Sequence, residues 1–158
     1  MNKENIPQPI NVSVVQAPIV WADKKANLAY FDRILSPLTG NTDLVVLPEM
    51  FATGFITDPG ETAEAMNGQV MEWMSATASN LNSVVTGSIT IKENEKFYNR
   101  LVWMRPDGSY ETADKRHLFR MGNEHLRFTA GVKPLITELK GWKIKPLVCY
   151  DLRFPVWS

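Results

Sequence analysis

The sequence predicts an α/β fold with mixed sheets, and two observations carry that prediction. Short apolar runs rich in β-branched residues recur along the chain, each about as long as a single strand. Two further stretches have apolar residues that return at helical spacing. No repeat, low-complexity stretch or flexible linker interrupts the pattern, so residues 1–158 are expected to form one domain.

Five of the apolar runs are expected to be strands, at residues 12–15, 44–47, 84–91, 97–104 and 147–150. The connectors Lys92–Lys96 and Arg105–Gly108 are rich in turn-forming residues. Such short turns between strands predict hairpins, and hairpins bring antiparallel neighbours into a mixed sheet.

Two amphipathic helices are expected. The first covers residues 23–35, where apolar residues fall on one face and Asp23 is placed to cap the N-terminus. The second covers residues 69–81, where an apolar stripe that contains Trp73 and Met74 is typical of a helix packed on a core.

Charge and cysteine content exclude several classes of function. Lysine plus arginine and aspartate plus glutamate each number 17, so no positive field favours nucleic acid or an anionic membrane surface. The N-terminus lacks a signal-peptide pattern and no apolar run approaches about 18 residues, from which we expect a cytoplasmic protein without a membrane partner. Cys149 is the single cysteine, which excludes an internal disulfide and argues against zinc, so it is expected to act as a thiol.

Three segments place a reactive side chain at the end of an expected strand, where scaffolds usually hold catalytic groups. They are Leu44–Phe51 with Glu49, Ala113–Phe119 with Lys115, and Pro146–Pro155 with Cys149. A cysteine that attacks an amide needs a base to take its proton and a cation to stabilise the negative oxygen that forms. A carboxylate and an ammonium group supply both, so the three residue types together predict nucleophilic catalysis.

These segments resemble the motifs of the nitrilase superfamily of carbon-nitrogen hydrolases. Its members carry a glutamate after an apolar strand, a lysine in a Lys-x-His-Leu-like segment and a cysteine in a Cys-Tyr-Asp-x-Arg-Phe segment. The chain shows all three in that order, at Glu49, Lys115 and Cys149. The residues that flank Glu49 and Lys115 look most like the omega-amidase subgroup, and the resemblance extends from Asn11 onward.

The resemblance implies an α-β-β-α sandwich, in which two sheets pack face to face between layers of helices. It also implies hydrolysis of a small linear amide, of the type of a 2-oxo-acid omega-amide, to a carboxylate and ammonia through a thioester on Cys149. In that reaction Glu49 is the expected general base, and Lys115 is expected to stabilise the oxyanion together with the backbone N–H of Tyr150.

Further site residues follow from the same resemblance. Glu124, which precedes Gly131, matches a second family glutamate that is expected to orient Lys115 and the substrate or the attacking water. Phe51 and Phe55 are expected to wall the substrate pocket. No cofactor and no metal ion are expected.

Taken singly, each residue also has a simpler interpretation. Cys149 is then an inert buried residue, Glu49 a solvated residue at a strand end and Lys115 an ordinary surface charge. The combined motif favours the catalytic interpretation for these three. For Glu124 a solvated loop carboxylate is an equally good interpretation.

The remaining polar residues near the motifs are expected to be structural. His117 and His125 suggest a metal site or a Cys–His dyad, but their spacing fits no standard zinc motif, so they are expected to be loop or packing residues. Asp151 and Arg153 are expected to pair and to brace the turn after Cys149.

Members of the family continue well beyond the position that corresponds to Ser158, so the sandwich is expected to be incomplete at its C-terminus in this chain. The expected partners are a small amide substrate and either a second copy of the chain or a separate C-terminal portion. The alternatives to an active omega-amidase are an inactive fragment that acts only by association, or a nitrilase or carbamoylase, because the same three side chains serve all of these enzymes.

Overall fold

The computed structural model describes residues 7–158, which form a mixed five-stranded sheet, a two-stranded sheet and two α-helices. The five strands lie in chain order as β1 (Val12–Val14), β2 (Leu44–Val46), β3 (Val84–Glu93), β4 (Lys96–Met104) and β5 (Tyr110–Asp114). Strands β1, β2 and β3 are mutually parallel, whereas β4 is antiparallel to both of its neighbours. The predicted α/β fold with a mixed sheet is confirmed.

Both expected helices are present, as α1 (Lys24–Leu35) and α2 (Gln69–Leu81). The side chain of Asp23 caps α1 by accepting a hydrogen bond of 2.9 Å from the backbone N–H of Ala26. Helix α2 ends at Asn82, whose φ of 51° is the left-handed conformation that commonly closes a helix. Neither of these helices, nor any other helix within residues 7–158, has the length and apolar character needed to cross a membrane.

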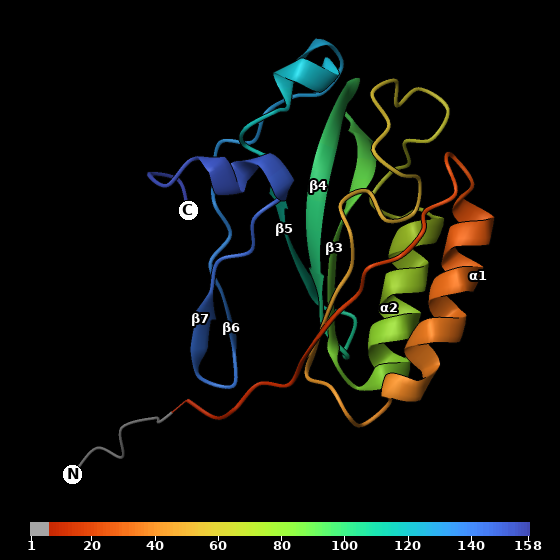
Figure 1. Ribbon diagram of the computed structural model, residues 1–158, viewed down its shortest axis with the longest axis vertical. Helices are drawn as coiled ribbons and strands as arrows, with labels where there is room; N and C mark the ends of the chain where they lie inside the picture. The colour runs from red at the N-terminus through yellow and green to blue at the C-terminus, as the bar shows by residue number, and fades with distance from the viewer. Residues whose placement is uncertain (1–6) are drawn as a thin grey trace.

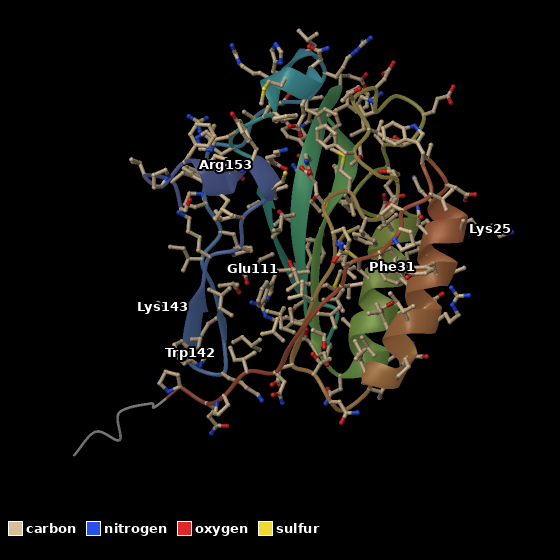
Figure 2. All side chains as sticks on the ribbon, in the orientation of Figure 1. Lys25, Phe31, Glu111, Trp142, Lys143 and Arg153 are labelled. Atoms are coloured by element: carbon tan, nitrogen blue, oxygen red, sulfur yellow. The ribbon has the colours of Figure 1, made fainter. Side chains whose placement is uncertain are left out.

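The five-stranded sheet separates two hydrophobic cores. Figure 1 shows α1 and α2 on one side of it and the hairpin of β6 (Thr137–Leu139) and β7 (Trp142–Ile144) on the other. Side chains alternate along a strand, so Val85 packs with the helices while Val84 packs toward the hairpin. Figure 2 shows Phe31 on the inner side of α1, in the helix-side core.

The layers within residues 7–158 therefore follow the α-β-β part of the expected sandwich. The second sheet is only two-stranded, and it is tied to the first by polar contacts as well as by the core. Glu111 on β5 accepts a hydrogen bond of 2.6 Å from the hydroxyl of Thr137 on β6. Figure 2 shows Glu111 in the space between β5 and the hairpin.

The strand expected at residues 147–150 is wrong. Cys149 instead begins a short 3₁₀ helix, η4 (Cys149–Arg153), and has a φ of 46° that no strand residue adopts. Asp151 closes this turn, because its backbone N–H donates to the carbonyl of Val148 at 3.1 Å. The apolar residues 147 and 148 are the approach to that turn, and an apolar run alone does not distinguish such an approach from a strand.

Candidate active site

Three strands of one sheet bring three polar side chains together. Glu49 follows β2 and Lys115 follows β5, and these two strands run in the same direction, so their carboxyl ends lie at one edge of the sheet. Asn99 lies near the start of the antiparallel β4 and therefore at that same edge. The backbone N–H of Lys115 donates to the carbonyl of Asn99 at 2.9 Å, which fixes the lysine directly against β4.

Lys115 is buried between two carboxylates. Its side chain has no solvent exposure, and Nζ donates to Oε1 of Glu49 at 2.7 Å and to Oε2 of Glu124 at 2.9 Å. Burial alone would lower the pKa of Lys115. The negative charges of Glu49 and Glu124, and the hydrogen bonds that Lys115 donates to them, outweigh this effect and raise the pKa. Lys115 is therefore an ammonium ion, and its third N–H is not used by either carboxylate.

Glu124 is fully buried, which excludes the solvated-loop interpretation of this residue. It begins the short helix η3 (Glu124–Leu126), and its Oε2 also accepts a hydrogen bond of 2.6 Å from the backbone N–H of Phe119. The segment that follows is seated on the sheet, because the backbone N–H of Gly131 donates to the carbonyl of Lys115 at 2.9 Å. A Cβ on Gly131 would lie 2.0 Å from the carbonyl oxygen of Asp114, so only glycine fits this approach.

Cys149 occupies the first position of η4, and the residue is exposed. Partial burial of its thiol raises the pKa, the charge of Glu49 and a hydrogen bond to Glu49 raise it further, and the charge of Lys115 acts in the opposite direction. Cys149 and Glu49 line the same pocket, and Glu49 in turn binds Lys115. With a raised pKa the sulfur rests as a thiol, so it needs a base during attack.

The thiol gives a first testable prediction. Glu49→Gln removes a negative charge that raises the pKa of Cys149 and leaves the opposing charge of Lys115 in place, so the pKa is expected to fall. The thiolate fraction at neutral pH then rises, and alkylation of Cys149 by iodoacetamide is expected to become faster and to reach its plateau at lower pH. The measurement is the alkylation rate from about pH 6 to pH 10, followed by intact mass.

Glu138→Gln on the exposed face of the β6–β7 hairpin is the matched control and is expected to leave the alkylation profile unchanged. The chain has a single cysteine, so every added mass reports on Cys149. Slower alkylation of Glu49→Gln at every pH would contradict this account of the charges at the sulfur.

A cleft of about 950 Å³ opens beside Cys149. It is mainly apolar, with one carboxylate and one guanidinium group, and its walls are Glu49, Phe55, Phe119, Met121, Cys149, Tyr150, Leu152 and Arg153. The rings of Phe119 and Tyr150 pack edge to face with their centroids 5.2 Å apart. Nζ of Lys115 lies 5.3 Å from the centroid of the Phe55 ring, so Phe55 covers the buried ammonium group.

The two phenylalanines that were expected to wall the pocket lie in different places. Phe55 is at the cleft, but Phe51 is fully buried in the helix-side core, where its ring packs edge to face against Phe31 with centroids 5.5 Å apart. The expectation for Phe51 is wrong. Met50 lies between Glu49 and Phe51 with a φ of 46°, and that turn carries the chain from the site into the core.

The expected pairing of Asp151 with Arg153 is also wrong. Oδ1 of Asp151 instead accepts a hydrogen bond of 2.8 Å from the backbone N–H of His117 and lies 2.9 Å from the His117 ring. The His117 ring stacks on Phe154 with centroids 3.6 Å apart, so this histidine is a packing residue, as expected. Asp151 thus joins the turn after Cys149 to the segment that follows Lys115.

Two residues of the site were not found by sequence reasoning. Asn99 contacts both Glu49 and Glu124, and no pattern in the sequence of β4 singles it out. Arg153 lines the cleft and makes no ion pair within the described part of the chain. Residues 7–158 hold no cluster of three or more His, Cys, Asp and Glu side chains that suits a metal ion.

The sequence of the chain is similar to those of several known proteins. Residues 11–157 match the profile of the carbon-nitrogen hydrolase family. The chain is 45% identical over 149 residues to the omega-amidase YafV of Escherichia coli K12, a match that covers 94% of the chain and 57% of that protein. It is 30% identical to the 2-oxoglutaramate amidase of Bacillus subtilis, of which it covers 58%.

The chain also matches solved structures of related proteins. A CN-hydrolase superfamily protein of Xanthomonas campestris, solved with an arsenic adduct in its active site, is 46% identical with a TM-score of 0.91. That match covers 94% of this chain and 56% of the other. Nit3 of Saccharomyces cerevisiae, a member of the nitrilase superfamily, is 28% identical with a TM-score of 0.80 over 94% of this chain and 58% of its own. The chain thus spans little more than half the length of these relatives.

Proposed function

Because the chain belongs to the carbon-nitrogen hydrolase family, we propose that it carries the reacting groups of an amidase that hydrolyses small linear omega-amides of 2-oxo acids. The observation that carries the proposal is that Glu49 binds Lys115 at 2.7 Å and, together with Cys149, lines an open cleft. The similarity to an omega-amidase and to a 2-oxoglutaramate amidase supports the choice of substrate class.

In the first half of the reaction the sulfur of Cys149 attacks the amide carbonyl carbon while Glu49 takes the thiol proton. A C–S bond forms and the carbonyl oxygen becomes negative. The third N–H of Lys115 and the backbone N–H of Tyr150, which lies in the first turn of η4, stabilise this oxygen. The C–N bond then breaks, and Glu49 returns the proton to the departing ammonia.

In the second half a water molecule attacks the thioester while Glu49 takes a proton from it. The C–S bond breaks, the product leaves as a carboxylic acid, and the proton returns to the sulfur. Glu124 holds Lys115 in place throughout, because it is the fully buried partner of the ammonium group. The atoms balance as one amide and one water converted to one carboxylic acid and one ammonia.

The cleft supports an anionic rather than a neutral substrate. Arg153 lies at the far end of η4 from Cys149, and its guanidinium group makes no ion pair within residues 7–158. Figure 2 shows Arg153 on the helical turn of η4. Cys149 and Arg153 both line the cleft, so one substrate can present an amide to the sulfur and a carboxylate to the guanidinium group.

The test compares 2-oxoglutaramate with a neutral aliphatic amide of similar length, by ammonia release. Arg153→Gln is expected to lower kcat/KM for 2-oxoglutaramate by about 10- to 100-fold, the usual size for a lost charge-assisted hydrogen bond. The neutral amide is expected to change little. Arg33→Gln, on an exposed face of α1, is the matched control and is expected to alter neither rate.

Equal losses for the two amides would contradict the assignment of Arg153 and leave the amidase reaction standing. Wild-type protein that is folded but releases no ammonia from either amide would contradict the proposed function itself. Hydrolysis of a nitrile in preference to both amides would favour a nitrilase instead.

A further inference from the structure

Asn99 is buried at the centre of the charged cluster without lining the cleft. The residue has no solvent exposure, and its side-chain Nδ2 donates to Oε1 of Glu49 at 2.9 Å and to Oε1 of Glu124 at 3.1 Å. The side-chain amide therefore donates both of its N–H groups to the two carboxylates that also bind Lys115.

The orientation of this amide follows from its neighbours. An oxygen turned toward two carboxylates would face like charge, so only the N–H side fits there. The opposite atom, Oδ1, is buried and has no hydrogen-bond partner among the described residues. An unsatisfied buried acceptor costs about 1 to 3 kcal/mol, so Asn99 favours the geometry of the carboxylates at the expense of its own hydrogen bonding.

The contacts divide the two oxygens of Glu49 into separate roles. Oε1 accepts from both Lys115 and Asn99, which fixes the plane of the carboxylate from two directions. Neither of these hydrogen bonds uses Oε2, so this oxygen remains available to take the thiol proton of Cys149. Without Asn99, a single contact to a lysine side chain would hold Glu49, and the carboxylate would be able to rotate about that contact.

We propose that Asn99 is a positioning residue, which holds Glu49 and Glu124 apart on either side of Lys115 and presents Oε2 of Glu49 to the sulfur. The inference rests on the proposed function, because it assigns Glu49 as the base. Asn99 acts on the chemical step through Glu49, because both of its N–H groups are already donated to Glu49 and Glu124.

The experiment replaces the amide while keeping its shape. Asn99→Leu removes both donors, and the hydrogen bond from the backbone of Lys115 to the carbonyl of residue 99 remains. We expect kcat for 2-oxoglutaramate to fall by about 10- to 100-fold, the effect of a catalytic group displaced by about 1 Å, with KM changed less than about twofold.

A second variant separates a hydrogen-bonding role from a role in packing. Asn99→Asp keeps the shape, and a protonated aspartic acid retains one O–H donor that an ionised one lacks. Its activity relative to Asn99→Leu is therefore expected to recover as the pH falls. A residue needed only for packing would show no such recovery.

Asn27→Leu is the matched control, because Asn27 is also a buried asparagine with two donated hydrogen bonds, but to the backbone carbonyls of Val20 and Ala52. It is expected to lower the melting temperature and to leave kcat per folded molecule and the pH profile unchanged. If Asn99→Leu lowers kcat no more than Asn27→Leu does, or if it raises KM in place of lowering kcat, the proposal is overturned.

Alkylation of Cys149 by iodoacetamide provides a readout that does not depend on turnover. Asn99→Leu is expected to shift the pH dependence of the alkylation rate, because Glu49 is no longer held in one orientation beside the thiol, whereas Asn27→Leu leaves it as in wild type. An unchanged alkylation profile in Asn99→Leu overturns the proposal for Asn99. This test works even if wild-type protein hydrolyses no amide, so a failure of the Asn99 proposal is distinguishable from a failure of the proposed function.

Discussion

Cys149→Ala is expected to abolish ammonia release, with a loss on the order of 10⁶-fold, as when the nucleophile of a covalent hydrolase is removed. Without the sulfur no thioester forms, and Glu49 and Lys115 have only water to activate. The variant is expected to fold as wild type does, because the residue is exposed and its side chain fills no core position. The measurement is kcat/KM by ammonia assay, with circular dichroism to establish folding.

Cys149→Ser is the informative companion, since it keeps a nucleophilic atom in the same place. A hydroxyl gives up its proton far less readily than a thiol, so its residual activity is expected to depend wholly on Glu49 as base. Loss of the nucleophile should leave far less than about one-thousandth of the wild-type rate. Ammonia release by Cys149→Ala above that level would therefore refute the covalent route.

Lys115→Met is expected to lower both activity and stability. Methionine retains the length of the side chain but not its charge, so the oxyanion loses a donor, which typically costs about 100- to 1000-fold in kcat. Glu49 and Glu124 are left facing each other without the cation that both of them bind. Removal of one partner from a buried ion pair destabilises a fold by about 3 to 5 kcal/mol.

Two measurements separate these effects for Lys115→Met. Urea denaturation gives the change in the free energy of unfolding, and kcat corrected for the folded fraction gives the effect on chemistry. Lys143→Met on strand β7, an exposed lysine visible in Figure 2, is the control and is expected to change neither quantity. If folded Lys115→Met keeps more than about a tenth of the wild-type kcat, Lys115 does not stabilise the oxyanion.

The elements predicted best are those with a strong period. Helix α2 has the predicted bounds, and β1 to β4 all coincide with predicted strands to within a few residues. Strands β2, β3 and β4 bury most of their apolar side chains, whereas Val12 and Val14 of β1 are exposed. A strand was expected before Lys115, but the bounds of β5 were not predicted, because its alternation mixes Tyr110 and Ala113 with charged residues and gives a weak pattern. The run at 147–150 was misread because the left-handed φ of Cys149 has no apolar signature.

In the site, sequence motifs located the reactive residues but not the contacts between them. The burial of Glu124 and Lys115 depends on the junction of β5 with the segment that ends at Gly131, a long-range feature that no local pattern reports. Phe51 was wrongly assigned to the pocket wall. It is close to Glu49 along the chain, but that closeness does not reveal that the turn at Met50 directs the chain away from the site. Asn99 was missed because its role exists only once two distant carboxylates converge on it.

The central claim is that the sulfur of Cys149 forms a covalent bond with the acyl part of an amide. Acid quenching within the first turnover, followed by intact mass spectrometry, tests it most directly, because the chain has one cysteine. We expect a transient species heavier than the free chain by the mass of 2-oxoglutaramate less ammonia, present in wild type and absent from Cys149→Ala. Ammonia release with no such species at any quench time, or the same added mass in Cys149→Ala, would contradict it.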